Sequence, residues 1–156
     1  TRSNYHPVYN EPMSQGTRCR QLAQYVVFES PLNMLCDSPS NYSKETECME
    51  FISAVPTVWD ETRALCGEVG KYIAMARRSG EDWYEGGMTD WNERTLTLDL
   101  SFLPQGAYAV ELYRDGVNAD RRASDYKKEV FDLPLNGLLK VKMAPGGGFA
   151  AKIVKK

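Results

Sequence analysis

Carboxylates are the first residues in this sequence whose type and placement could support chemistry. In glycoside hydrolysis, an acid and a second carboxylate flank the scissile bond. Asp37 is the best placed, because it follows the apolar run 32–36 and would stand at the C-terminal end of a buried strand. The alternative for Asp37 is a turn former or helix cap beside Pro39. Four further carboxylates have weaker positional arguments and form no convincing catalytic pair: Glu29, Asp60, Glu61 and Glu68.

Aromatic side chains are a second candidate set, because the apolar face of a sugar ring stacks on an aromatic ring. Trp91 is the best placed, since it lies in the polar loop 89–93. Trp59, Trp83 and Tyr84 are further candidates. The alternative for all of these residues is a place in the core, where each ring buries a large area. Trp91 is therefore the candidate substrate-binding aromatic.

Nucleophilic, phosphate and metal sites have less support. His6 is the only histidine and no G-x-S-x-G sequence occurs, which disfavours a histidine-based triad. The run 145–148 precedes the strand-like segment 149–153, so it indicates a tight turn rather than a phosphate-binding loop. Residues 115–120 carry three side chains with oxygen atoms that could bind calcium, but Gly116 is not at the position that an EF-type calcium loop requires. We therefore interpret this segment as the exit and loop of a hairpin rather than as a calcium site. We expect no catalytic residue and no metal ligand in this chain.

Four cysteines, Cys19, Cys36, Cys48 and Cys66, are separated by 17, 12 and 18 positions. Zinc ribbons and thioredoxin-like sites need closer pairs, because short spacing brings two thiolates onto one metal or into one redox pair. Buried free thiols are the favoured interpretation. One or two disulfides are the alternative if the protein is exported.

The first third of the chain predicts a helix, a strand and a second helix. Between residues 16 and 31 the apolar positions recur at three- and four-residue steps, with Thr17 as the N-cap. The apolar run 32–36 indicates a buried strand, and residues 44–54 again show helical spacing. Because a helix-strand-helix piece cannot complete an α/β sheet, we interpret it as the tail of a larger barrel.

From Thr57 onward the pattern changes to the period of two that is typical of strands. Leu96, Leu98 and Leu100 share one face of such a strand, while the residues between them are polar. Seven or eight short strands separated by turns predict an antiparallel β-sandwich, so the chain is expected to be mostly β. Strands are expected at residues 72–77, 82–85, 94–100, 107–113, 127–131, 138–143 and 149–153.

Composition disfavours several classes of partner. The 19 Lys and Arg against 21 Asp and Glu leave a formal net charge of −2 and no basic run, so we expect no nucleic acid partner. The longest apolar runs have a few residues, far short of the roughly 20 that span a bilayer, so no membrane span is expected. The chain begins with Thr1 rather than Met, which we interpret as a processed N-terminus or an excised fragment.

The segment TRCRQLAQYVVFESPLNMLCDSP, at residues 17–39, is followed by several shorter motifs. Those motifs lie at residues 51–52, 55–62, 67–73, 83–86 and 146–150. In the same order, they resemble the end of the catalytic barrel and the C-terminal stretch of glycoside hydrolase family 97. The resemblance covers nearly the whole chain.

The resemblance implies a bacterial exo-acting α-glucosidase or α-galactosidase, periplasmic or outer-membrane associated, that acts on α-linked oligosaccharides. Residues 1–56 would be the tail of its (β/α)8 barrel, and residues 57–156 a C-terminal β-sandwich domain described in the family as an oligomerisation region. The family's catalytic carboxylates and glutamate-held calcium lie upstream, so none of them maps to this chain. The sequence therefore leaves open whether the parent enzyme acts on α-glucosides or α-galactosides. It also leaves open whether the reaction inverts or retains the anomeric configuration.

By the same resemblance, residues 32–36 would be the eighth barrel strand, and Asp37 would support the active-site rim. The helix at 17–30, severed from its barrel, would expose an apolar stripe. That stripe consists of Leu22, Ala23, Val26 and Val27. The predicted function is a non-catalytic part, inactive alone, that braces the rest of the barrel and mediates homo-oligomerisation. The alternative is a carbohydrate-binding module that uses exposed aromatics such as Trp91.

Overall fold

The computed structural model describes residues 5–10, 14–30 and 37–156, which form three short helices and eight strands. The helices are α1 (Arg18–Val27), α2 (Pro39–Tyr42) and α3 (Thr46–Ala54). The strands are β1 (Glu61–Glu68), β2 (Tyr72–Ser79), β3 (Asp82–Thr89), β4 (Arg94–Asp99), β5 (Tyr108–Asp115), β6 (Tyr126–Asp132), β7 (Leu138–Met143) and β8 (Gly148–Lys155). The mostly β fold expected from the sequence is confirmed.

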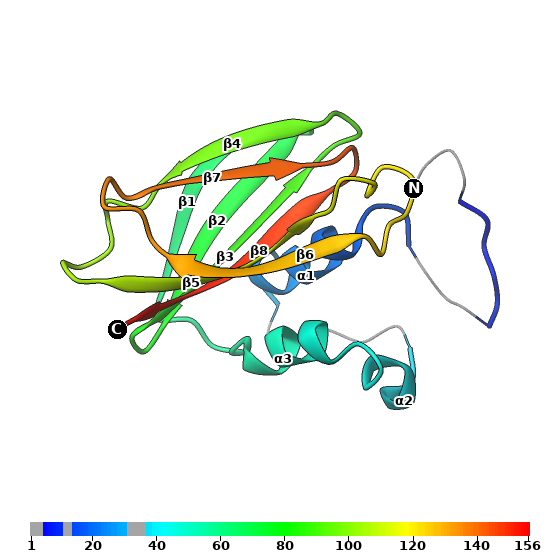
Figure 1. The fold of residues 1–156 in the computed structure, drawn as a ribbon, viewed down its shortest axis with the longest axis horizontal. Helices are drawn as coiled ribbons and strands as arrows, with labels where there is room; N and C mark the ends of the chain where they lie inside the picture. The colour runs from blue at the N-terminus through cyan, green and yellow to red at the C-terminus, as the bar shows by residue number, and fades with distance from the viewer. Residues whose placement is uncertain (1–4, 11–13, 31–36) are drawn as a thin grey trace.

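The strands form two antiparallel sheets of unequal size. A six-stranded sheet has the order β1-β2-β3-β8-β5-β6, and a two-stranded sheet pairs β4 with β7. Figure 1 shows β4 and β7 along one side of the large sheet and α3 on the opposite side. The strand β1 was missed, because Glu61–Glu68 is an exposed edge strand without a clear apolar face. The strand expected at 32–36 lies outside the described residues.

The space between the two sheets holds the main hydrophobic core. The dry face expected for β4 is confirmed, because Leu96, Leu98 and Leu100 point into this core while the alternate residues of the strand face solvent. The β7 strand shows the same alternation, with every second residue buried. From the large sheet, β2, β3, β5 and β8 contribute the opposing side chains. The two-stranded sheet therefore covers one face of the large sheet, and a continuous apolar layer lies between them.

The helix α1 covers the other face of the large sheet, against β3 and β8. Its stripe Leu22, Ala23, Val26 and Val27 is at most 7% exposed. The expectation that this stripe would be left open is therefore wrong, because the sheet itself covers it. Strand β3 is buried along both faces in consequence.

The ends of α1 are set by local sequence. The hydroxyl of Thr17 accepts a hydrogen bond from the backbone N–H of Arg20 at 3.2 Å, which confirms Thr17 as the N-cap. Gly148 at the start of β8 allows the helix to lie close to the sheet, since an added Cβ there would stand 2.8 Å from the Cα of Arg20. A side chain at that position would push the helix away from the sheet.

Candidate functional site

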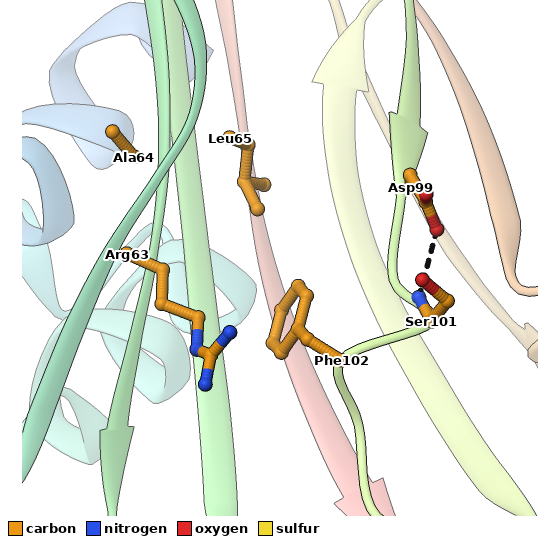
Figure 2. A pocket seen from close by; sticks show the side chains of 6 residues that line it. All are labelled: Arg63, Ala64, Leu65, Asp99, Ser101 and Phe102. Atoms are coloured by element: carbon orange, nitrogen blue, oxygen red, sulfur yellow. Dashed lines mark hydrogen bonds between the residues drawn. The ribbon is translucent and has the colours of Figure 1, made fainter.

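A surface pocket of about 480 Å³ lies between the edge strand β1 and the loop after β4 (Figure 2). Its lining residues are Arg63, Ala64, Leu65, Asp99, Ser101 and Phe102. The guanidinium of Arg63 lies over the Phe102 ring, 4.9 Å from its centroid, and its Nε lies 2.5 Å from Oε1 of Glu61. The pocket therefore combines a cation, a carboxylate, a hydroxyl group and an aromatic ring.

Asp99 is the one carboxylate in this lining. Hydrogen bonds from the backbone and side chain of Ser101 lower the pKa of Asp99, so this group is ionised at neutral pH. Cleavage of a glycosidic bond needs an acid and a second carboxylate on either side of the bond. The pocket can thus hold a polar ligand against Phe102, but its lining supplies no acid–base pair.

Asp37 lies two residues before the start of α2, next to its N-cap Ser38, and is partly exposed. Its carboxylate accepts hydrogen bonds from the side-chain amide of Asn41 at 3.0 and 3.1 Å and from the backbone N–H of Ser38 at 2.6 Å. These bonds, that of Asn41 first, lower the pKa of Asp37. The carboxylate therefore closes the turn into α2, and its place at a barrel rim stays a prediction.

Trp91 lies in the bend between β3 and β4 and is partly buried. Its indole packs against Gly146, where an added Cβ would stand 2.4 Å from Cζ3 of the ring. The backbone N–H of Gly146 also donates to the carbonyl of Asp90 at 2.7 Å, which joins the two loops. Part of the indole is thus covered by the protein, and sugar binding by Trp91 stays a prediction.

The turn expected at residues 145–148 is confirmed, and a buried carboxylate holds it. Oδ2 of Asp115, at the end of β5, accepts hydrogen bonds from the backbone N–H groups of Ala144 at 2.9 Å and Gly148 at 3.0 Å. Burial raises the pKa of Asp115, while hydrogen bonds from Thr17 and the two amides oppose that rise. Gly146 occupies the left-handed region with φ of +67°, which glycine adopts without strain.

Glu85 is a fully buried carboxyl that the sequence analysis missed. It lies in β3 on the face that carries Trp83, opposite Ala76 in β2 and Ala151 in β8. Its exposure is 0%, and neither carboxyl oxygen has a hydrogen-bond partner among the described residues. Burial raises the pKa of Glu85 to about 8, so the group is mostly neutral at pH 7. Strand alternation from Trp83 would have placed it inside, although glutamate in a strand usually indicates the wet face.

Arg77 in β2 is a second buried charge that was missed. Its Nη1 donates to the carbonyl of Phe28 at 3.4 Å and its Nη2 to that of Val27 at 3.5 Å. The guanidinium also lies 5.7 Å from the ring centroid of Trp59. A cation at this point complements the negative end of the α1 dipole. Arg77 therefore fastens the C-terminus of α1 to the sheet.

The helix α3 lies on the same face of the large sheet as α1, where side chains of β5 and β6 hold it. The hydroxyl of Tyr113 lies 3.0 Å from the carbonyl oxygen of Glu47, and the hydroxyl of Tyr126 donates to Oε2 of Glu47 at 2.8 Å. Nζ of Lys128 contacts Oε2 of Glu50 at 3.0 Å. Because these groups come from strands far along the chain, the helices and the sheet form one packed structure.

Cys19 in α1 and Cys48 in α3 are buried free thiols, as predicted. Cys66 is also free but lies partly exposed on the edge strand β1. Burial raises the pKa of all three thiols. Cys36 lies outside the described residues. Across the described parts of the chain, no group of three or more His, Cys, Asp or Glu side chains could hold a metal ion.

Comparison with known proteins identifies relatives for nearly the whole chain. A family model described as the C-terminal, oligomerisation region of glycosyl hydrolase 97 matches residues 58–154. A retaining alpha-galactosidase of Bacteroides thetaiotaomicron is 59% identical over 153 residues, which are 98% of this chain and 23% of that protein. A probable retaining alpha-galactosidase of Streptomyces bingchenggensis is 30% identical over 131 residues, covering 84% of this chain and 20% of that protein.

Solved structures show the same relationship. A glycoside hydrolase family 97 enzyme from Pseudoalteromonas sp. strain K8, in complex with acarbose, superposes with a TM-score of 0.86 at 37% identity. The match covers 91% of this chain and 23% of that enzyme. A beta-arabinopyranosidase superposes with a TM-score of 0.74 at 30% identity, over 90% of this chain and 22% of that one. The chain thus spans about a quarter of the length of the proteins that it matches.

Proposed function

Because the chain belongs to glycoside hydrolase family 97, we propose that it is the non-catalytic C-terminal part of a retaining α-galactosidase, which it braces and helps to assemble into oligomers. The names of both curated relatives support the galactoside and the retaining course. An α-glucosidase is the alternative parent, supported by the family member solved with acarbose. Self-association is supported by the description of the matching family model.

One observation carries the bracing role: α1 and α3 are packed and hydrogen-bonded onto the large sheet. Arg77 binds the end of α1, while Tyr113, Tyr126 and Lys128 bind α3. If residues 1–56 form the end of a barrel, the last elements of that barrel are anchored to the β-sandwich. The sandwich would then stabilise the barrel without contributing to its chemistry.

The bracing role is tested by Arg77→Ala in the full-length enzyme. We expect the midpoint of thermal inactivation to fall by several degrees, because the carbonyls of Val27 and Phe28 at the end of α1 lose their donor. The kcat and KM measured well below that midpoint should stay unchanged. Arg121→Ala is the matched control, because the Arg121 side chain is 87% exposed. Equal thermal inactivation of Arg77→Ala and the wild type would argue against bracing.

The substrate of the parent enzyme and the self-association of the chain are tested by separate measurements. The full-length enzyme should hydrolyse an aryl α-galactoside faster than the matching α-glucoside, and the 156-residue chain alone should hydrolyse neither. Light scattering after size exclusion of the 156-residue chain should show a dimer or larger species over a concentration series. A preference for the glucoside would shift the proposal to an α-glucosidase, and a monomer at every concentration would remove the assembly role.

We propose a periplasmic or outer-membrane location for the parent enzyme, supported by the family resemblance alone. In the described part of the chain, no helix is long and apolar enough to cross a membrane. Calcium in the parent's barrel is likewise proposed from the family resemblance alone. Fractionation of the native bacterium, with metal analysis of the purified enzyme, would check both expectations.

A further inference from the structure

We propose that Glu85 is a proton-dependent latch in the core: its neutral form allows the two sheets to close over it, and its ionisation loosens the two-stranded sheet. The carboxyl is 0% exposed and both of its oxygens lack partners among the described residues. An unpaired polar group in an apolar interior is costly, and an unpaired charge is far more so. Loss of the proton to solvent therefore favours any conformation that lets water reach Glu85.

The neighbours of Glu85 within the large sheet offer space but no polar partner. Ala76 and Ala151 stand opposite it on the two adjacent strands, and both are fully buried. Their methyl groups leave room for the longer glutamate side chain, and they cannot donate a hydrogen bond. The ionised carboxylate would thus gain nothing from its lateral neighbours.

The small sheet above this face is equally apolar. Its buried inward side chains, two from β4, one from the residue after it and three from β7, are all hydrocarbon or thioether groups. They are Leu96, Leu98, Leu100, Leu139, Val141 and Met143, of which Leu100 directly follows β4. The strand order shows no ladder of backbone hydrogen bonds between the two sheets. The small sheet is therefore the layer that separates most easily when a charge forms beneath it.

The charged groups on this face of the large sheet lie towards its edges and strand ends, and most of the cations among them pair with a carboxylate. By strand alternation, β1 carries Glu61 and Arg63 on this face, β2 carries Arg78 and the end of β8 carries Lys155. Towards the opposite edge of the sheet, β5 carries Arg114 and β6 carries Lys127 and Glu129, and the Glu129 carboxylate pairs with both of these cations. Arg78 pairs with Glu61 at 3.4 Å, and Arg63 pairs with the same carboxylate at 2.5 Å. On the small sheet, strand alternation puts Arg94, at the start of β4, on the inward face, where its guanidinium lies 4.5 Å from the Tyr72 ring centroid and 3.8 Å from Oδ1 of Asp90. Loosening the small sheet would admit water at the edge that holds Arg63.

The direction of the pH effect follows from the raised pKa of about 8. The folded state retains the Glu85 proton above the pH at which the unfolded state loses it. The stability contributed by the neutral group is fully present below about pH 4.5 and is lost as pH rises from there to about 8. The small sheet should therefore be closed at pH 6 and loosened at pH 9.

Hydrogen–deuterium exchange of peptides from β4 and β7 tests this proposal in the intact protein. After correction for the intrinsic pH dependence of amide exchange, opening at pH 9 should exceed that at pH 6 by roughly a hundredfold, because opening rises about tenfold per pH unit up to the folded pKa of about 8 and then levels off. Glu85→Gln, which cannot ionise, should abolish this difference. A wild type without the difference, or a glutamine variant that retains it, would overturn the proposal.

Two further variants keep the test decisive. Glu93→Gln is the matched control, because Glu93 is an exposed glutamate next to β4 that pairs with Lys142 of β7 at 2.9 Å. It should retain the pH dependence of the wild type. If Glu85→Gln fails to fold, Glu85→Leu supplies an apolar side chain of similar size and should give peptides that stay protected at both pH values. Opening of the leucine variant at pH 9 would contradict the latch.

Discussion

Gly86 in β3 lies so close beneath Ala23 in α1 that an added Cβ at Gly86 would stand 2.8 Å from the Ala23 carbonyl oxygen. The same Cβ would stand 2.9 Å from Cβ of Val26. The helix backbone therefore rests directly on the backbone of the sheet. This contact explains why the apolar stripe of α1 is covered without the help of any other part of a parent protein.

Replacing Gly86 by alanine should displace α1. We expect a loss of about 1–3 kcal/mol in the free energy of unfolding, because overpacking a close contact forces the backbone to shift. Thermal unfolding measures this loss, and hydrogen exchange should rise in residues 18–27. Gly67→Ala in the exposed edge strand β1 is the control, since its nearest contact would be 3.2 Å away. Equal effects of both substitutions would contradict a specific contact with α1.

Asp115→Ala should destabilise the turn before β8. The substitution leaves the N–H groups of Ala144 and Gly148 without their acceptor, and each buried unpaired donor costs about 1–3 kcal/mol. Urea denaturation should therefore show a loss of several kcal/mol in the free energy of unfolding. Asp120→Ala, on the exposed loop after β5, should change stability by less than about 0.5 kcal/mol. Comparable midpoints of urea denaturation for both variants would count against Asp115 as the residue that holds the turn before β8.

Glu129 should contribute to the loss of stability in acid. Hydrogen bonds from Arg114 and Lys127 lower the pKa of Glu129 to about 2. Because the unfolded value is near 4.3, its contribution to stability is present above about pH 4.5 and is lost as pH falls towards 2. Glu129→Gln should flatten this part of the curve of unfolding free energy against pH. If the unfolding free energies of the wild type and Glu129→Gln fall identically between about pH 4.5 and pH 2, this assignment is refuted.

The described cysteines should react with a thiol reagent in a fixed order. Cys66 is partly exposed, whereas Cys19 and Cys48 are 0% and 5% exposed. Under native conditions the reagent should therefore modify Cys66 first, and denaturant should make all three sites react at similar rates. Peptide mass spectrometry identifies the modified sites. Modification of native Cys19 as fast as Cys66 would show that the helix layer opens readily.

The sequence alone determined the features that depend on local periodicity and turn chemistry. The apolar spacing predicted α1 and α3, the alternation around Leu98 predicted β4 with one dry face, and the glycine run predicted the turn at 145–148. Each of these signals lies within a dozen residues, because helix and strand periods are properties of neighbouring side chains. The motifs along the chain likewise identified the family.

Only the tertiary structure decided how the layers meet and which polar groups become buried. The contact between α1 and Gly86 joins residues about sixty positions apart, and Arg77 reaches carbonyls about fifty positions before it. The edge strand β1 was missed because an exposed strand needs no apolar face. Glu85 was missed because its side chain type indicates solvent, while the pairing of β3 between β2 and β8 places it in the core. Alternation from Trp83 indicates which face of β3 carries Glu85, but only the strand order shows that this face is covered there.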